Sequence, residues 1–145
     1  MKTSGAPSSL LEIHVSNSPG FKPLVDSNHW RVALMNFTPE HTPDNVTEFQ
    51  RHDETDELFV LLSGRCILFV GEGEGSISQL YAQDLQPFTL YNVKRGSWHT
   101  HVLSPEAKLV IVENRDTSSR NSPRIKINPD LHTAILRLTH LTWGD

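Results

Sequence analysis

Short apolar runs separated by turn-forming residues recur along most of this chain. The runs are rich in β-branched and aromatic side chains, and they follow one another at spacings of roughly 8–12 residues, as in all-β sandwiches and barrels. Before residue 129, no segment has the apolar period of about 3.6 residues that marks a helix. The pattern predicts an all-β fold with strands over 46–51, 57–63, 65–70, 76–81, 88–93, 98–103 and 108–113.

The N-terminal part is less regular. Residues 1–9 are small and polar, which predicts a loose end, and residues 10–15 are apolar enough to predict a short first strand. A turn cluster follows at 16–20, and a strand is expected over 30–37. We therefore expect the barrel to span 10–115.

The C-terminal part, 116–145, begins with a polar linker over 116–122. Apolar residues return over 129–143, where the pattern fits a short helix followed by a strand or coil. We expect this tail to pack on the barrel or on a partner subunit.

Composition narrows the class of protein. A chain of 145 residues suits one domain, and its net charge of -4 with a pI near 6.0 favours neither nucleic acid nor an anionic membrane as a partner. No apolar run reaches the ~18 residues of a spanning helix, and the first residues lack the apolar centre of a signal peptide. A single cysteine allows no intrachain disulfide. We predict a cytoplasmic protein.

Side chains that could bind a metal ion lie on two of the predicted strands and just before one of them. His52 stands just before the strand that begins with Glu57, and His99 and His101 lie two residues apart on a later strand. Because strand side chains alternate, Gln50 shares a face with His52, and His99 shares one with His101. If these strands meet in one sheet, two neutral imidazoles and a carboxylate converge. That set suits Fe(II), and also Zn, Mn or Ni, with open positions for water or substrate.

Other readings stay open at this point. Histidines near strand ends often only bond a neighbour, and Glu57 fits a charge that discourages edge pairing. Gln50 is a poor ligand for such an ion but can orient a bound water. His101 is a candidate for a fourth ligand, for a group behind the first ligands, or for a substrate contact. Phe59 and Leu61 lie two and four residues after Glu57, so their side chains should share its face of the strand. They are therefore predicted to line an apolar pocket.

These residues resemble the first motif of the cupin superfamily, roughly His-x-His, three or four residues, Glu, six residues, Gly. His52, Glu57 and Gly64 stand at this spacing. The second motif, Pro-x-Gly, two residues, His, is similar to the stretch from Lys94 to His99. The resemblance covers about residues 30–115 and implies a double-stranded β-helix, the jelly-roll barrel.

The resemblance also implies a function. His52, Glu57 and His99 would hold one divalent metal in the barrel interior, beside a small-molecule ligand, with Glu57 as general base if it leaves the ion. Small cupins include dioxygenases, isomerases, epimerases and lyases. The chain departs from the motifs, because Gln50 takes the place of a histidine and Lys94 that of the proline. The alternative is therefore a metal-free, non-catalytic module that binds or senses a small molecule.

A second copy of the chain is the expected partner. Leu58, Val60 and Leu62 have the parity opposite to Glu57 and should form an apolar outer face. Together with the tail around Leu136 and Trp143, this face predicts a homodimer.

Overall fold

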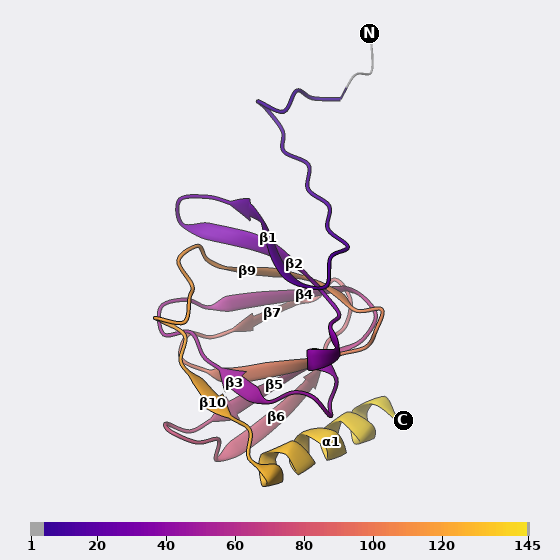
Figure 1. The fold of residues 1–145 in the computed structure, drawn as a ribbon, viewed down its shortest axis with the longest axis vertical. Helices are drawn as coiled ribbons and strands as arrows, with labels where there is room; N and C mark the ends of the chain where they lie inside the picture. The colour runs from indigo at the N-terminus through magenta and orange to yellow at the C-terminus, as the bar shows by residue number, and fades with distance from the viewer. Residues whose placement is uncertain (1–4, 145) are drawn as a thin grey trace.

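The computed structural model describes residues 5–144, which form two antiparallel five-stranded sheets, a short 3-10 helix and one α-helix (Figure 1). Sheet A contains, in spatial order, β1 (Gly20–Asp26), β2 (Trp30–Asn36), β9 (Lys108–Asn114), β4 (Glu57–Ser63) and β7 (Leu90–Val93). Sheet B contains β10 (Arg124–Lys126), β3 (Glu48–Gln50), β8 (Trp98–Leu103), β5 (Cys66–Glu72) and β6 (Gln79–Asp84). The fold is the predicted all-β jelly roll.

The alternation seen in the sequence decides which side chains enter the barrel. Along β4, Glu57, Phe59 and Leu61 are buried, whereas the residues between them are half-buried on the outer face. The apolar core between the sheets is built in the same way from inward positions of the long strands. Its central members are Met35, Phe59, Leu61, Cys66, Leu68, Leu103, Leu109 and Ile111.

A second apolar cluster lies on the outer face of sheet B, beneath α1 (Pro129–Trp143). Asn128 caps this helix, because its side chain accepts the backbone N–H of Leu131 at 2.8 Å. The helix ends at Gly144, which has the left-handed φ of 73° that favours glycine. Ile135 packs against Phe49, Ile67, Phe69, Trp98 and Val102. The C-terminal tail thus covers its own sheet as one helix.

Several elements differ from the sequence-based expectation. Residues 10–15 form no strand, because they lie outside the barrel with no neighbouring strand to pair with (Figure 1). Two strands were not predicted: β1, which begins inside the expected turn cluster, and the three-residue β10, which follows the polar linker. In both segments a proline or charged residues interrupt the apolar alternation. Within residues 5–144, no helix is long and apolar enough to cross a membrane.

The barrel interior has two ends with different character. β4 runs from Glu57 at one end to Ser63 at the other, and antiparallel β9 places Glu113 at the first end and Lys108 at the second. Along β8, His99 lies near Glu57 at the first end, and Leu103 pairs with Cys66 at the second. We call these the polar end and the apolar end of the interior.

Candidate metal centre

Three side chains at the polar end point toward one another. The Oε2 atom of Glu57 lies 3.0 Å from His52 Nε2 and 2.7 Å from His99 Nε2. These residues are 3%, 5% and 1% exposed, respectively, and one ligand atom from each lies within 4.8 Å of the others. Ligand atoms bound to one ion at about 2.0–2.2 Å stand roughly 3–3.5 Å apart. The ligand atoms therefore lie near this spacing, with Glu57 and His99 at hydrogen-bonding distance from each other.

The local structure fixes both imidazoles. His52 follows β3, and its carbonyl accepts the N–H of Gly96 at 2.8 Å, which ties its loop to the β7–β8 turn. Its Nδ1 lies 2.7 Å from Ser122 Oγ. His99 Nδ1 lies 3.0 Å from the carbonyl oxygen of Ser97. Each ring thus turns Nε2 inward, in the manner of metal-binding histidines held by a second contact.

The Ser97 contact decides where the hydrogen of His99 sits. A carbonyl oxygen only accepts, so Nδ1 carries the hydrogen and donates it. A neutral His99 then presents the lone pair of Nε2 to the Glu57 carboxylate. That contact is favourable only with a cation between the two atoms, either a proton on Nε2 or a metal ion. The donor set, two nitrogens and one carboxylate, suits a divalent transition metal.

Charge within the cluster shifts the pKa values of its members. Burial alone would raise the pKa of Glu57, but hydrogen bonds from His52 and His99 and their charges hold it well below its usual range. Burial likewise would lower the pKa of His52, but the hydrogen bond to Glu57 and the charges of Glu57 and Glu113 raise it. The pair therefore favours a charged carboxylate and a proton or other cation beside it.

Glu113 is a site residue that the sequence reasoning missed. Its Oε2 lies 3.7 Å from His52 Nε2, and its Oε1 accepts two bonds from Arg31, at 3.0 Å and 2.6 Å. Burial and the charge of Glu57 raise the pKa of Glu113, although Arg31 opposes them. Glu113 lies two residues after Ile111 and four after Leu109, so alternation along the strand could have placed it on the same inward face. Ser122 was missed too, because it lies in the polar linker, where no pattern assigns a direction.

The structure places the other predicted residues around this cluster. Gln50 pairs with His99 between β3 and β8, so the two side chains share a face. His101 stacks on His41 with centroids 4.8 Å apart and planes 6° apart. Its Nε2 is buried without a hydrogen-bond partner among the described residues, and burial first, then the charge of His41, lowers its pKa to about 3.

The two apolar residues predicted to line a pocket differ in position. Phe59 meets the rings of both His99 and His101 edge-on, with centroids 6.0 Å and 5.8 Å away. It separates the polar end from the core. Leu61 lies one step deeper on β4, is 1% exposed and belongs to the apolar core.

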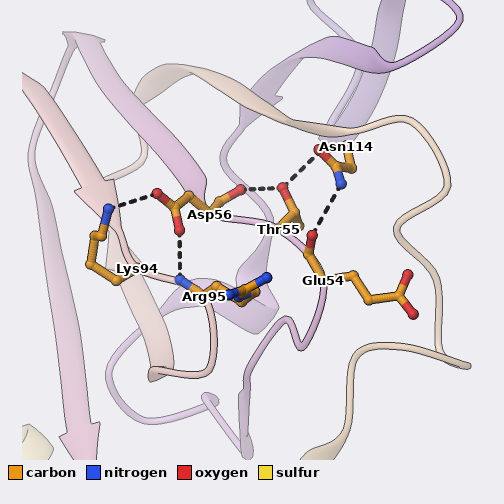
Figure 2. A pocket seen from close by; sticks show the side chains of 6 residues that line it. All are labelled: Glu54, Thr55, Asp56, Lys94, Arg95 and Asn114. Carbon is orange, nitrogen blue, oxygen red and sulfur yellow. Dashed lines mark hydrogen bonds and ion pairs between the residues drawn. The ribbon is translucent and has the colours of Figure 1, made fainter.

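An open pocket of about 470 Å³ lies at the rim of the polar end (Figure 2). Asp56 accepts the backbone N–H of Arg95 at 2.7 Å and Lys94 Nζ at 3.0 Å, and the first of these bonds contributes most to lowering its pKa to about 2. The Asn114 side-chain amide donates to the Glu54 carbonyl at 3.1 Å. The lining groups are thus largely bonded to one another, and they join the loops that carry His52 and Gly96.

Comparisons with known proteins establish the fold. No family model matches the chain, and no curated protein matches it. Among solved structures, a double-stranded beta-helix domain protein from Klebsiella pneumoniae is 13% identical over 86% of this chain and 92% of that chain, with a TM-score of 0.51. The QdtA 3,4-ketoisomerase of Thermoanaerobacterium thermosaccharolyticum, solved with TDP, is 13% identical over 70% and 68%, with a TM-score of 0.52.

A cupin-2 domain protein from Shewanella frigidimarina is 23% identical over 74% of this chain and 87% of that chain, with a TM-score of 0.47. The fold assignment rests on the two likenesses with higher TM-scores and on the two sheets described above. The chain has a double-stranded β-helix fold, which is the fold that its two motifs predict.

Proposed function

We propose that the polar end of the barrel binds one divalent metal ion, held by His52, Glu57 and His99, together with a small organic molecule. The observation that carries the proposal is the approach of two inward Nε2 atoms to one carboxylate oxygen, at 3.0 Å and 2.7 Å. When bound, such an ion polarises a carbonyl or hydroxyl of a ligand.

The residues around the ion have separate tasks in this proposal. Ser97 and Ser122 hold the two imidazoles with Nε2 inward. Glu57 keeps its negative charge and serves as a ligand, or as a general base if it turns away from the ion. Glu113, held by Arg31, adds a second carboxylate beside His52 and favours a cation there.

The ligand is proposed to contact His101. A buried polar atom without a partner costs about 1–3 kcal/mol, and Nε2 of His101 is such an atom. Because His101 shares the inward face of β8 with His99, a polar atom of a ligand beside the ion would lie within reach of it. Stacking on His41 and the edge of Phe59 keep the ring in place.

The experiment is a metal titration of purified protein after removal of bound ions with a chelator. Added Co²⁺ is expected to bind at one ion per chain, with visible absorption that reports its ligands. His99→Ala should abolish this binding, whereas His29→Ala, an exposed histidine outside the cluster, should leave it intact. Full Co²⁺ binding by a folded His99→Ala protein, or none by the parent chain, would contradict the proposal.

A metal-free binding module is the second candidate. It is favoured by Gln50 in place of a histidine ligand and by the ability of a protonated His99 to donate to Glu57 without any ion. Elemental analysis of freshly purified protein separates the two candidates. Metal near one equivalent supports the metal centre, and ligand binding by protein that stays metal-free after Co²⁺ addition supports the module.

A further inference from the structure

Besides Glu57, a second buried carboxylate lies beside the cluster at the polar end. Glu113 is 6% exposed and belongs to β9, which pairs with β4 in sheet A. The register of these strands sets Leu58 opposite Val112, so the next position places Glu113 across from Glu57 on the inward face. Two glutamates therefore stand side by side in the barrel interior.

The two carboxylate oxygens of Glu113 have different surroundings. Oε1 accepts two hydrogen bonds from Arg31, at 3.0 Å from Nε and at 2.6 Å from Nη2. The guanidinium also donates to the carbonyl oxygen of Thr117 at 3.1 Å, which holds it in place. Oε2 accepts no hydrogen bond from the described residues, and it lies 3.7 Å from His52 Nε2. One oxygen is therefore anchored, and the other is free to bind a cation.

His52 cannot satisfy both carboxylates. Its Nε2 lies 3.0 Å from Glu57 Oε2 and 3.7 Å from Glu113 Oε2, and an imidazole nitrogen carries at most one hydrogen. Glu57 is the nearer acceptor, and its Oε2 also lies 2.7 Å from His99 Nε2. Glu113 Oε2 therefore faces the cluster without a hydrogen to accept, whereas one metal ion can bind two carboxylates at once.

The charge at the polar end favours a divalent ion. While the imidazoles are neutral, Glu57 and Glu113 bring two negative charges into the interior, and Arg31 brings one positive charge. A buried charge that no neighbour balances is costly. A divalent ion beside both carboxylates removes the excess of negative charge.

The strand that supplies a fourth ligand in the cupin motif carries Gln50 in this chain. Gln50 pairs with His99 between β3 and β8, in sheet B. Its amide oxygen is a poor ligand for a transition-metal ion, which binds imidazole and carboxylate more readily. Glu113 approaches the cluster from the opposite sheet, so a carboxylate on β9 can take the part that a histidine on β3 has in the motif.

We propose that Glu113 is the fourth protein ligand of the metal ion, binding through Oε2 while Oε1 stays on Arg31. This inference rests on the metal site proposed above. Among the described residues, the ligand atoms that all lie within 4.8 Å of one another come from His52, Glu57 and His99, so Glu113 stands at the edge of the cluster. Its Oε2 must turn toward the ion, starting from a distance to His52 Nε2 little above the roughly 3–3.5 Å between ligands of one ion.

A second carboxylate ligand changes which ion the site prefers. Imidazole is a good ligand for Ni²⁺, whereas carboxylate oxygens suit Mn²⁺. A site with two nitrogens and two charged oxygens should therefore bind Mn²⁺ more tightly, relative to Ni²⁺, than the same site without Glu113. This preference distinguishes a ligand from a carboxylate that only contributes charge, because charge alone attracts both divalent ions equally.

The test is equilibrium dialysis of the full chain, freed of metal with a chelator, against Mn²⁺ and against Ni²⁺. Glu113→Gln should lower the affinity for Mn²⁺ by at least about tenfold and the affinity for Ni²⁺ by less. Glu113→Asp keeps the charge but draws the carboxylate back by one methylene group, so its affinity for Mn²⁺ should fall as well. Glu106→Gln, which removes an exposed carboxylate at the apolar end, is the matched control and should change neither affinity.

The outcomes separate this inference from the metal site on which it rests. A parent chain that binds neither ion, or a folded His99→Ala protein that binds both like the parent, contradicts the site itself. If the site is sound, the parent binds one ion and His99→Ala does not. In that case an equal loss for both ions in Glu113→Gln, or undiminished Mn²⁺ binding by Glu113→Asp, means that Glu113 acts through its charge alone and overturns its role as a ligand.

Discussion

The two ends of the barrel interior contrast in what their buried side chains contribute. At the apolar end, Leu61, Leu103 and Leu109 are at most 2% exposed, and burying each such side chain stabilises the fold by about 1.5–3 kcal/mol. At the polar end, equally buried Glu57 and His99 lose hydration, which their mutual attraction does not fully return. The apolar end contributes stability through burial, whereas the polar end carries the residues that we propose to bind a metal ion and a ligand.

The two ends share strands. β4 carries Glu57 and Leu61, β8 carries His99 and Leu103, and β9 carries Glu113 and Leu109. Packing at the apolar end therefore fixes the register that brings the ligands together. Substitutions at the polar end should alter binding with little effect on folding, and substitutions at the apolar end should do the reverse.

The largest expected effect on binding is that of Glu57→Gln. Substituting a residue that supports a metal ligand typically lowers metal affinity by ~10–100-fold. Glu57→Gln should lower it by more, because the variant loses the charged ligand itself. Its free energy of unfolding should change by no more than about 1 kcal/mol, since the glutamine amide nitrogen, at the position of Oε2, can donate one N–H to the Nε2 of each imidazole. Co²⁺ titration and urea denaturation measure the two quantities. Unfolding of this variant would show that the polar end also carries the fold.

The opposite result is expected for Leu61→Ala at the apolar end. Removing a buried leucine side chain leaves a cavity and should cost about 2–5 kcal/mol of unfolding free energy. Leu62→Ala, on the half-buried outer face of the same strand, is the matched control and should cost less. The folded fraction should still bind one Co²⁺ per chain. Loss of the ion without loss of stability would break the division between the ends.

The glycines that close the two ends should also differ. Gly64, at the apolar end of β4, has φ +71°, and a Cβ there would lie 2.5 Å from the backbone of Ala107. Gly96, at the polar end, has φ +81°, but a Cβ would meet no heavy atom within 4 Å. Gly96→Ala should cost about 1–2 kcal/mol for its left-handed backbone, and Gly64→Ala clearly more because the backbone must shift. Equal midpoints in thermal unfolding would contradict this ordering.

The sequence predicts the features that neighbouring residues determine, and it misses contacts between residues that lie far apart in the chain. Strands β4 and β8 match the predicted bounds, because short runs rich in aromatic, apolar and β-branched residues, bounded by Gly and Ser, are local features of the sequence. The motif spacing was enough to bring together His52, Glu57 and His99. Ser122 could not be predicted, since its approach to His52 joins residues 70 positions apart through a linker without pattern. Residues 10–15 were wrongly predicted to form a strand for a related reason: their apolar residues are visible in the sequence, but in the described part of the chain no strand pairs with them.

A smaller effect on binding is expected from Ser122→Ala. The hydroxyl lies 2.7 Å from His52 Nδ1 and orients a ring that contributes one ligand, so metal affinity should fall by about 10–100-fold while the stoichiometry stays at one. Ser104→Ala, at the apolar end, removes a hydroxyl that accepts the N–H of Arg65 at 2.9 Å and serves as the control. Unchanged Co²⁺ affinity in Ser122→Ala would mean that His52 is oriented by Glu57 alone.

The smallest expected effect is the pH dependence of stability, which only the polar end should show near neutrality. His101 keeps its pKa near 3 in the fold because burial disfavours its charge, against an ordinary value of 6.5. The unfolded chain therefore binds a proton that the folded chain does not, and stability falls as the pH drops below 6.5, by up to about 1.4 kcal/mol per unit. Urea denaturation between pH 6.5 and 5 should show a shallower slope in His101→Phe than in the parent chain.

Other groups with shifted pKa values also bear on the sign of this slope. Burial lowers the pKa of His41, which adds to the slope set by His101, and burial raises the pKa of Glu113, which opposes it. The raised pKa of His52 contributes stability that is fully present below 6.5 and is lost as the pH rises through its folded value, so it opposes the slope set by His101. The lowered pKa of Glu57 contributes stability that is lost only below about 4.5, outside the measured range.

Both proteins carry these other groups, so the difference in slope between His101→Phe and the parent chain reports His101 when the cluster and the stacked His41 stay in place. His29→Ala, at an exposed position, is the control variant and should leave the slope unchanged. Equal slopes in all three proteins would mean that His101 is protonated alike in the folded and unfolded chain, and that its ring does not share the dry environment of the interior.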